Sequence, residues 1–453
     1  MEFYGFIHFT VNTFTNREWG DGDEDPLIFN PTEFDADQWV KTCKRAGMKG
    51  IILTCKHHDG FCLWPSRYTE HSVKNSPWKD GKGDIVKEVS DACRKENMKF
   101  GVYLSPWDRH EKSYGDSDRY NEYYRNQLTE LLSNYGDIFE VWLDGACGEG
   151  KNGKKQVYAW DEYYDVVRRL QPNAVIAVCG PDVRWCGNEA GHCRRSEWSV
   201  VPKNLLNVEK IQDKSQKFDD GKFSKVVNSS DEDLGSREAI KDAEDLVWYP
   251  SEVNTSIRPG WFYHPSEDDK LKSVDELLNI YYGSVGGNAA FLLNIPPDKR
   301  GLIHEADVQV LEGFGSALRR IFKNDLLKSS AISVSSRLNV KQDGMNLLDD
   351  SLDTCWSPQK FDENPTIIIG FSEPRNIDRV VLMEYIKLGQ KVEGFSIEYN
   401  DNGKWIEFFN GTTVGYKKIC CFERINVKTV RVIIKKSRGT PSIARLAAYN
   451  SGV

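Results

Sequence analysis

The first 320 or so residues alternate between short apolar runs and longer amphipathic stretches, and this alternation restricts the fold more than any other feature. Apolar runs typical of buried strands occur at residues 3–10, 50–54, 99–104, 138–143 and 174–178. Helix patterns lie between them, at residues 35–46, 84–96, 118–135 and 158–170. We expect Asp35 and Gln38 to form a capping box at the first helix, and Gly47 to end it. Repeated strand-then-helix units indicate a parallel sheet covered by helices.

The pattern weakens after residue 180 and then returns. Residues 201–247 are polar and charged, which indicates a long insertion with some helix. A helix pattern at 274–282, a strand pattern at 289–293 and a helix pattern at 304–323 follow. If the weaker region is included, eight units fit, which predicts an α/β fold of the (β/α)8, TIM-like barrel type. A doubly wound open sheet is the alternative, and the lack of a GxGxxG or phosphate-loop motif makes it the weaker one.

From residue 326 the texture changes to short alternating runs separated by Asn-Gly, Asp-Asn-Gly and Pro signals. The runs lie at residues 366–371, 379–385, 394–399, 405–409, 418–422, 429–435 and 444–449. Seven or eight such strands predict an all-β sandwich of the jelly-roll type. We therefore expect two domains, a barrel over residues 1–325 and a sandwich over residues 326–453.

Charge and hydropathy exclude some classes of protein. The formal net charge is −8, with 60 Lys and Arg against 68 Asp and Glu, so a nucleic-acid partner is not expected. No run reaches the 18 or so apolar residues that a membrane-spanning helix requires. The chain enters a strand-like run at once, without a signal peptide. We expect a periplasmic or secreted protein whose leader is absent from this chain, with a cytoplasmic location as the alternative.

The cysteines predict buried thiols rather than a disulfide framework. There are 11 of them, and they form no CxxC pair and no repeating spacing. Most lie in apolar segments, where a free cysteine behaves as a small hydrophobic residue. A zinc site built from Cys186, His192 and Cys193 is the alternative, but no partner spacing supports it.

Polar and aromatic residues follow the predicted barrel strands. In a parallel barrel the carboxyl ends of the strands converge on one pocket. The first four strands end near His8, near His57 and His58, at Tyr103, and in Trp142-Leu143-Asp144-Gly145. This mixture suits sugar recognition, because aromatic faces pack on C–H surfaces while His, Asp and Glu bind hydroxyl groups. A metal site formed by the histidines with Asp144 is the competing interpretation, although no HxH or HExxH motif supports it.

Asp144 is the candidate nucleophile, because it follows an apolar strand whose end should face the pocket. An Asp-Gly turn is the simpler interpretation of the same residues. Hydrolysis of a glycoside also requires a second carboxyl group that protonates the leaving oxygen. Glu189, Glu197 and Glu252 are candidates, and the residue pattern alone does not choose among them.

Four motifs together resemble the retaining α-L-fucosidases of glycoside hydrolase family 29. They are Ile-His-Phe-Thr at 7–10, Lys-His-His-Asp-Gly-Phe at 56–61, Tyr-Leu-Ser-Pro-Trp-Asp at 103–108 and Glu-Val-Trp-Leu-Asp-Gly at 140–145. They occur in the family's order, each at a predicted strand end, and the resemblance covers residues 1–322. The segment Arg-Trp-Cys-Gly-Asn-Glu-Ala-Gly at 184–191, followed by Ser-Glu-Trp-Ser, is similar to the subfamily that acts on α-1,3 and α-1,4 linkages.

This resemblance implies roles for individual residues. Asp144 would be the nucleophile that forms a covalent fucosyl-enzyme, and Glu189 would be the acid/base residue. Glu252 is the second candidate for that role, because the position of the acid/base residue varies within the family. The residues implied in substrate binding are His8, His57, His58, Trp64, Tyr103, Trp142, Arg258 and Trp261. No organic cofactor and no metal in the active site are implied, and the oligomeric state stays open.

The C-terminal region resembles a discoidin-like sandwich related to carbohydrate-binding modules of family 32. The resemblance rests on residues 348–356 and on Ile-Glu-Tyr-Asn at 397–400 followed by Trp405. In that fold the Asp-rich turn often holds calcium, but Asp350 stands here where glycine is commoner. We expect a domain that supports the barrel, with sugar binding and a structural calcium ion as alternatives.

The sequence thus predicts an exo-glycosidase that releases terminal α-L-fucose from α-1,3- and α-1,4-linked, Lewis-type glycans by double displacement. Three alternatives remain. The first is another retaining barrel glycosidase, acting on galactosides or N-acetylhexosaminides. The second is a catalytically inactive glycan-binding protein. The third is a metal hydrolase that uses His57 and His58.

Overall fold

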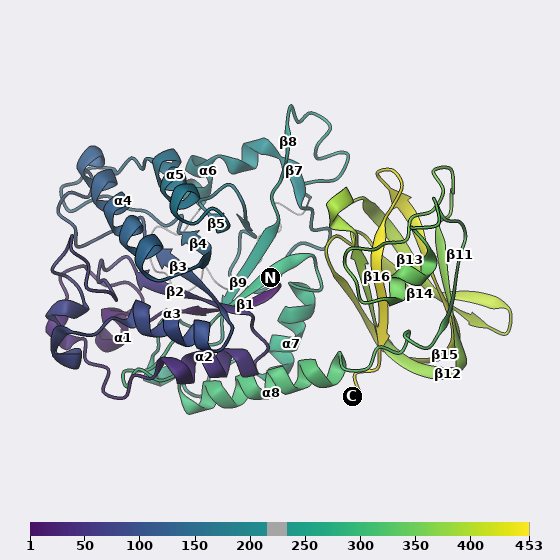
Figure 1. Ribbon diagram of the computed structural model, residues 1–453, viewed down its shortest axis with the longest axis horizontal. Helices are drawn as coiled ribbons and strands as arrows, with labels where there is room; N and C mark the ends of the chain where they lie inside the picture. The colour runs from purple at the N-terminus through teal and green to yellow at the C-terminus, as the bar shows by residue number, and fades with distance from the viewer. Residues whose placement is uncertain (215–232, 453) are drawn as a thin grey trace.

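The computed structural model describes residues 1–214 and 233–452, which form a barrel surrounded by helices and an all-β domain beside it (Figure 1). The barrel occupies the N-terminal part of the chain, and the long helix α8 runs beneath it towards the β domain. Among the described residues, no helix is long and apolar enough to cross a membrane.

Eight parallel strands form the barrel, in the order β5-β4-β3-β2-β1-β10-β9-β6. Their bounds are β1 Phe3–Ile7, β2 Gly50–Lys56, β3 Lys99–Leu104, β4 Ile138–Leu143, β5 Val175–Val178, β6 Arg184–Trp185, β9 Ser251–Ser256 and β10 Ala289–Asn294. A single parallel bridge between Ala177 and Val183 links β5 to the start of β6 and nearly closes the ring. The prediction of a TIM-like barrel is confirmed.

Helices cover the outside of the barrel. They are α1 Val11–Thr15, α2 Ala36–Arg45, α3 Ile85–Lys95, α4 Ser117–Asn134, α5 Trp160–Leu170, α6 Val208–Lys214, α7 Val274–Gly283 and α8 Glu305–Ile321. Asp35 caps α2 by accepting from the backbone N–H of Gln38, as expected. The predicted capping box is wrong in its second half, since the Gln38 side chain instead bonds to the backbone of Ile303. A complete capping box occurs at α7, between Ser273 and Glu276.

One connection lacks the helix that a regular (β/α)8 barrel has between neighbouring strands. Only residues 179–183 join β5 to β6, although parallel strands usually need a crossover of about a dozen residues or more. Val178 turns the chain with a φ of 67°, in the left-handed region. The long insertion comes instead after β6, where β7 Val200–Pro202 pairs with β8 Leu246–Trp248. Part of the predicted insertion, residues 215–232, lies outside the described residues.

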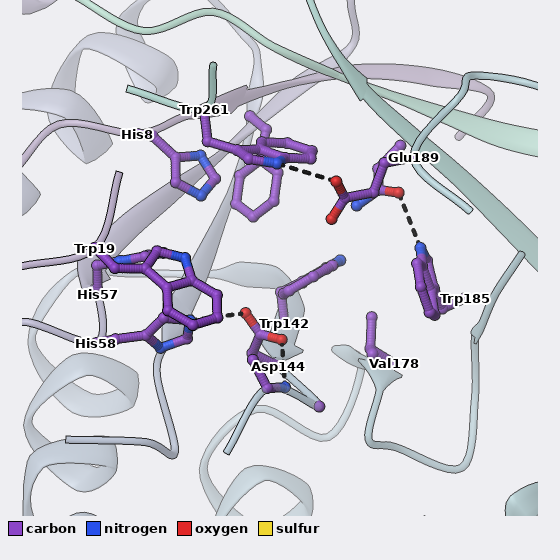
Figure 2. A pocket seen from close by; sticks show the side chains of 14 residues that line it. His8, Trp19, His57, His58, Trp142, Asp144, Val178, Trp185, Glu189 and Trp261 are labelled. Atoms are coloured by element: carbon purple, nitrogen blue, oxygen red, sulfur yellow. Dashed lines mark hydrogen bonds and ion pairs between the residues drawn. The ribbon is translucent and has the colours of Figure 1, made fainter. Parts of the chain in front are cut away.

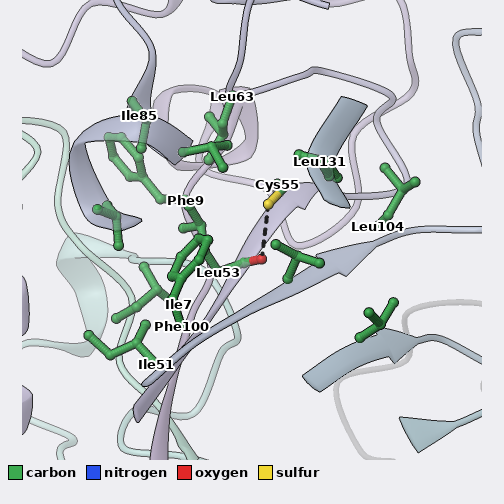
Figure 3. Packing of buried hydrophobic residues seen from close by; sticks show 14 of the residues in the cluster. Ile7, Phe9, Ile51, Leu53, Cys55, Leu63, Ile85, Phe100, Leu104 and Leu131 are labelled. Atoms are coloured by element: carbon green, nitrogen blue, oxygen red, sulfur yellow. Dashed lines mark hydrogen bonds between the residues drawn. The ribbon is translucent and has the colours of Figure 1, made fainter. Parts of the chain in front are cut away.

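Successive side chains along a barrel strand point alternately outward to the helices and inward to the barrel axis, which gives two separate apolar layers. Ile51 and Leu53 of β2 point outward and pack with Phe9, Ile85 and other residues against the helices (Figure 3). Ile52 between them belongs to the separate cluster inside the barrel. Burial of each such side chain contributes about 1.5–3 kcal/mol, so both layers hold the strand ends in fixed positions.

The C-terminal domain is a six-stranded antiparallel structure. Its strands are β11 Ala331–Val334, β12 Thr366–Glu384, β13 Val392–Asp401, β14 Lys404–Gly411, β15 Lys418–Ser437 and β16 Ile443–Tyr449. The two predicted runs at 366–371 and 379–385 form the single long strand β12, and those at 418–422 and 429–435 form β15. The first half of β12 pairs with the second half of β15, while its second half also pairs with β16. Each of the two long strands therefore changes its neighbouring strand along its length and runs through the whole domain.

An apolar cluster joins the two domains. Ile419 and Tyr449 of the C-terminal domain pack with Tyr281, Tyr282 and Phe322, which lie in or beside α7 and α8. The Ile419 backbone N–H donates to the carbonyl oxygen of Gly286 at 3.0 Å. Near the chain start, the Lys417 ammonium contacts both carboxylate oxygens of Glu2 at 2.6 Å.

Eight of the 11 cysteines are buried free thiols, which agrees with the expectation from their apolar surroundings. They are Cys43, Cys55, Cys62, Cys93, Cys179, Cys186, Cys355 and Cys420.

Candidate active site

A pocket opens at the carboxyl ends of the barrel strands, where the sequence places its polar and aromatic residues (Figure 2). Strands β1, β4, β5, β6 and β9 each contribute a residue to its wall, and the loops that follow β1, β2, β4, β6 and β9 contribute the others. The lining residues are Phe6, His8, Trp19, His57, His58, Trp142, Asp144, Gly145, Ala146, Val178, Trp185, Glu189, Asn254 and Trp261.

Asp144 follows β4 directly, and its carboxylate is held by two donors. The Tyr103 hydroxyl donates to Oδ2 at 2.9 Å, and the Ala146 backbone N–H donates to Oδ1 at 2.8 Å. Burial raises the pKa of Asp144 above its ordinary value, while these hydrogen bonds act in the opposite direction. The side chain keeps 21% of its exposure, on the side that faces the pocket. The carboxylate is thus oriented by the protein yet open to a ligand.

Glu189 reaches the same pocket from the segment that follows β6. Nε1 of Trp261 donates to its Oε2 at 3.2 Å. Trp261 is in turn fixed by Glu18, whose Oε2 accepts from the Trp261 backbone N–H at 2.8 Å. The carboxyl groups of Asp144 and Glu189 point into the same open space from different sides (Figure 2).

His8 has a defined hydrogen-bonding role. The Asn294 amide nitrogen donates to Ser256 and to the Trp261 carbonyl oxygen, so Oδ1 of Asn294 faces the His8 ring. Nδ1 of His8 therefore donates to that oxygen at 2.8 Å, and Nε2 is left as an acceptor. Burial lowers the pKa of His8 to about 3, so the ring is neutral near pH 7.

His57 and His58 lie side by side, with ring centroids 4.1 Å apart and ring planes tilted by 39°. The Ser105 hydroxyl donates to the Trp107 carbonyl oxygen, so its oxygen accepts from Nδ1 of His58 at 2.7 Å. Nε2 of His58 then lies as an acceptor 3.8 Å from Oδ2 of Asp144. Burial lowers the pKa of His58 to about 3 and the pKa of His57 well below its ordinary value. The histidines therefore offer neutral acceptors to hydroxyl groups rather than positive charges.

Three of the pocket's indole rings are anchored through their N–H groups. Trp142 donates to Glu252 at 2.7 Å, Trp185 donates to Asn254 at 2.9 Å, and Trp261 donates to Glu189. A tethered indole presents a fixed apolar face to a ligand, since its polar edge is already satisfied. Such faces suit the C–H surfaces of a sugar ring.

Glu252 lies below the pocket rather than in its wall. It is two residues before Asn254 on β9, and a strand rises by about 3.3 Å per residue, so Asn254 occupies the layer that reaches the pocket. The Glu252 carboxylate accepts from Tyr4 and Trp142, and it adjoins the equally buried Glu140. Burial raises the pKa values of both glutamates. The geometry favours Glu189 over this second candidate.

Glu197 is also engaged elsewhere. Its carboxylate is 1% exposed and binds Arg184 and Arg194 in ion pairs. The carboxylate therefore serves the packing of the loop that carries Glu189, and Glu197 is absent from the pocket wall.

Two residues predicted to bind substrate do not line the pocket. Trp64 packs in the cluster between barrel and helices, and its indole N–H donates to Glu130 at 2.8 Å. Arg258 forms a buried ion pair with Asp307 and a second pair with Asp268. The predictions for Trp64 and Arg258 are corrected on these grounds. Tyr103 reaches the site through its bond to Asp144.

Sequence reasoning missed Trp19, Trp185 and Asn254 as lining residues. Trp19 lies in a loop, and Trp185 in a strand of two residues, where no periodic pattern marks a position. Asn254 had a usable signal, because it stands two positions beyond Glu252 on the same face of one strand.

The metal alternatives gain no support from the arrangement of side chains. Within residues 1–214 and 233–452, no group of three or more His, Cys, Asp or Glu side chains is arranged to hold a metal ion. This covers both the histidines of the pocket and the group Cys186, His192 and Cys193.

A barrel of parallel strands with two carboxyl groups facing one pocket at its carboxyl end is an arrangement that glycoside hydrolases use. The sequence model described as α-L-fucosidase matches residues 8–321. The chain belongs to this α-L-fucosidase family, glycoside hydrolase family 29, whose members are retaining glycosidases. The model of the F5/8 type C domain matches residues 330–447, which confirms the discoidin-like prediction for the C-terminal domain.

Relatives match over nearly the whole chain. α-L-Fucosidase 1 of Arabidopsis thaliana is 41% identical over 98% of this chain and 84% of its own length. A fucosidase of this family from Ruminococcus gnavus, solved in complex with fucose, is 31% identical, covers 99% of this chain and 92% of its own, and superposes with a TM-score of 0.85. A family 29 member from a rumen bacterium is 38% identical, covers 100% of this chain and 75% of its own, and gives a TM-score of 0.80.

Proposed function

We propose that Asp144 is the nucleophile and Glu189 the acid/base residue with which this enzyme releases terminal α-L-fucose. One observation carries the assignment: both carboxyl groups face the same pocket (Figure 2), whereas Glu197 and Glu252 are absent from its wall and are held by other side chains. The anion at Asp144 is oriented by the Tyr103 hydroxyl and the Ala146 N–H, as a nucleophile requires.

The reaction follows from this placement in two displacements. In the first, a carboxylate oxygen of Asp144 attacks the anomeric carbon, the glycosidic C–O bond breaks, and Glu189 gives its proton to the departing oxygen. In the second, Glu189 takes a proton from water, whose oxygen attacks the same carbon and frees Asp144. Two inversions leave fucose with the configuration of the substrate.

The remaining lining residues bind the sugar in this proposal. The neutral rings of His8 and His58 accept hydrogen bonds from fucose hydroxyl groups through Nε2. His57 lines the pocket through the rest of its ring, since its Nδ1 is buried and has no hydrogen-bond partner among the described atoms. The tethered faces of Trp142 and Trp261 pack on the apolar side of the ring. The Ruminococcus gnavus relative was solved in complex with fucose, which supports fucose as the sugar bound in this proposal.

We propose α-1,3- and α-1,4-linked fucose on branched, Lewis-type glycans as the substrate. The support is the segment 184–191, which resembles that subfamily and forms the wall around Glu189, where the rest of the glycan must leave the pocket. Glycans of this kind are displayed outside cells, so a periplasmic or secreted location is proposed with it.

We propose no organic cofactor and no calcium ion for this chain. The Asp-rich turn of the C-terminal domain does not fit calcium, because lysine and arginine side chains already form ion pairs with two of its carboxylates. Asp350 pairs with Lys328 and Arg445, and Asp353 pairs with Lys387. A third carboxylate, that of Asp349, accepts from the Ser351 N–H and the Thr354 hydroxyl.

The test is hydrolysis of a Lewis a trisaccharide beside 2′-fucosyllactose by the wild type, Asp144→Ala and Glu189→Ala. Release of fucose from the branched sugar alone, lost in both variants, would support the linkage and both assignments. Near wild-type activity in Glu189→Ala would move the acid/base role to Glu252. A wild type that binds the sugars without releasing fucose would favour the glycan-binding alternative, and activity on a galactoside or N-acetylhexosaminide would favour the other glycosidases.

A further inference from the structure

Gln390 of the C-terminal domain reaches across to the barrel and pairs with its backbone. Its Oε1 accepts from the Ser199 N–H at 2.8 Å, and its Nε2 donates to the Glu197 carbonyl oxygen at 2.9 Å. The side chain is only 4% exposed, so both bonds are shielded from water. Asn288 of the barrel reinforces the same point, since its Nδ2 donates to the Glu197 carbonyl oxygen at 3.0 Å.

Glu197, whose backbone Gln390 binds, also holds the loop around Glu189 through its side chain. The Glu197 carboxylate pairs with Arg184 at the beginning of that loop and with Arg194 at its end. Nη1 of Arg194 also donates to the Cys186 carbonyl oxygen at 3.0 Å. Both ends of the loop are therefore tied to one buried carboxylate, and the position of that carboxylate depends on the backbone at residues 197–199.

From this chain of contacts we infer that Gln390 is a positioning residue for the acid/base group. By fixing the backbone at 197–199, it sets where Glu197 holds the loop and hence where Glu189 meets the leaving oxygen. A displacement of about 1 Å at a reacting group lowers a rate by as much as a hundredfold. The C-terminal domain thus takes part in proton transfer without touching substrate. This inference rests on the proposed role of Glu189.

Two substrates with different leaving groups can show whether Gln390 positions Glu189 for proton transfer or only supports the fold. Departure of a sugar alcohol requires protonation, whereas departure of fluoride from α-L-fucosyl fluoride does not. When formation of the fucosyl-enzyme is irreversible, kcat/KM reports only the steps up to and including it. Glu189 acts as an acid in those steps, so the comparison of kcat/KM between the two substrates measures acid catalysis. We expect Gln390→Met, which keeps the side-chain volume, to lower kcat/KM about tenfold or more on a Lewis a trisaccharide and less than twofold on the fluoride.

Lys417→Ala is the matched control, because it also removes a contact between the domains, while the Lys417 ammonium pairs with Glu2 rather than with a residue of the loop. It should affect both substrates equally and little. Gln390→Glu is the second variant: it keeps the acceptor for the Ser199 N–H but replaces the donor to Glu197 by a second acceptor that carries a buried charge. Equal losses on both substrates in the Gln390 variant that folds, or the same selective loss in Lys417→Ala, would overturn the inference.

Glu189→Ala run in parallel distinguishes the two levels of the argument. If it shows no dependence on the leaving group, the acid/base assignment itself fails. If it loses the trisaccharide reaction selectively while the Gln390 variants do not, only the positioning role fails.

Discussion

Tyr103 and Asp144 are joined across two neighbouring barrel strands: the Tyr103 hydroxyl at the end of β3 donates to Oδ2 of Asp144 just past β4, at 2.9 Å. The bond gives the carboxylate a fixed orientation and lowers its pKa, against the upward effect of burial. If Asp144 is the nucleophile, as proposed, it must be ionised to attack, so we expect this contact to affect both the rate and its dependence on pH.

Tyr103→Phe should therefore weaken the enzyme most at acid pH. Without the hydroxyl, the pKa of Asp144 rises further, so the pH below which kcat/KM falls moves upward. A hydrogen bond to a charged group contributes about 1.5–3 kcal/mol, which corresponds to a loss of about 10- to 100-fold in kcat/KM. A pH profile measures both effects. Tyr120→Phe is the control, since that hydroxyl binds the Pro106 carbonyl oxygen instead; an acid limb that does not move in Tyr103→Phe would contradict the role given to this bond.

Fucose binding should not depend on histidine titration. His8 and His58 have pKa values lowered to about 3 by burial, so they stay neutral from pH 5 to 8. We expect the dissociation constant of fucose for the double variant Asp144→Asn/Glu189→Gln, which removes both carboxyl groups of the pocket wall, to be constant over this range. Calorimetry at several pH values measures it. A step in affinity with a midpoint near 6.5, the ordinary value for histidine, would show that a pocket histidine becomes charged.

Glu252→Gln should reduce stability and leave acid catalysis intact. The amide cannot accept from Tyr4 and Trp142 with both of its ends, so one buried donor loses its partner at a cost of about 1–3 kcal/mol. Denaturant unfolding measures this loss. On the trisaccharide and the fluoride, kcat/KM should fall by the same factor. A loss confined to the trisaccharide would instead make Glu252 the proton donor.

Arg258→Met should unfold more easily and still bind fucose. Arg258 and Asp307 are fully buried partners, and removal of one member of such a pair costs about 3–5 kcal/mol. Where the variant is folded, the dissociation constant of fucose should match the wild type. A large rise in that constant without loss of stability would return Arg258 to the binding site.

The sequence predicted the site best where local pattern and barrel geometry coincide. His8, His57, His58 and Asp144 each follow a recognisable apolar strand, and the ends of parallel strands must meet. Trp64 and Arg258 were misplaced because a motif fixes the order of residues, whereas the direction of a side chain depends on its partners. Trp19 could not be found, since it reaches the pocket from a loop.

The fold shows the same division. Eight strands were expected and are present. The sequence did not show that β5 and β6 are joined without a helix, because residues 179–183 resemble the start of an ordinary loop. The long strand β12 was divided in two because its bulged middle, between Gly370 and Arg375, interrupts the pattern of alternation.

The apolar contact of Tyr281, Tyr282 and Phe322 with the C-terminal domain limits how the two parts can be recombined. A barrel expressed alone would present these rings to water and become prone to association, while a foreign module in place of the native one would have to match both that surface and the reach of Gln390. The domains are thus separate in architecture but joined by a shared interface, and chimeras of the barrel with other modules would first have to preserve that interface in order to fold.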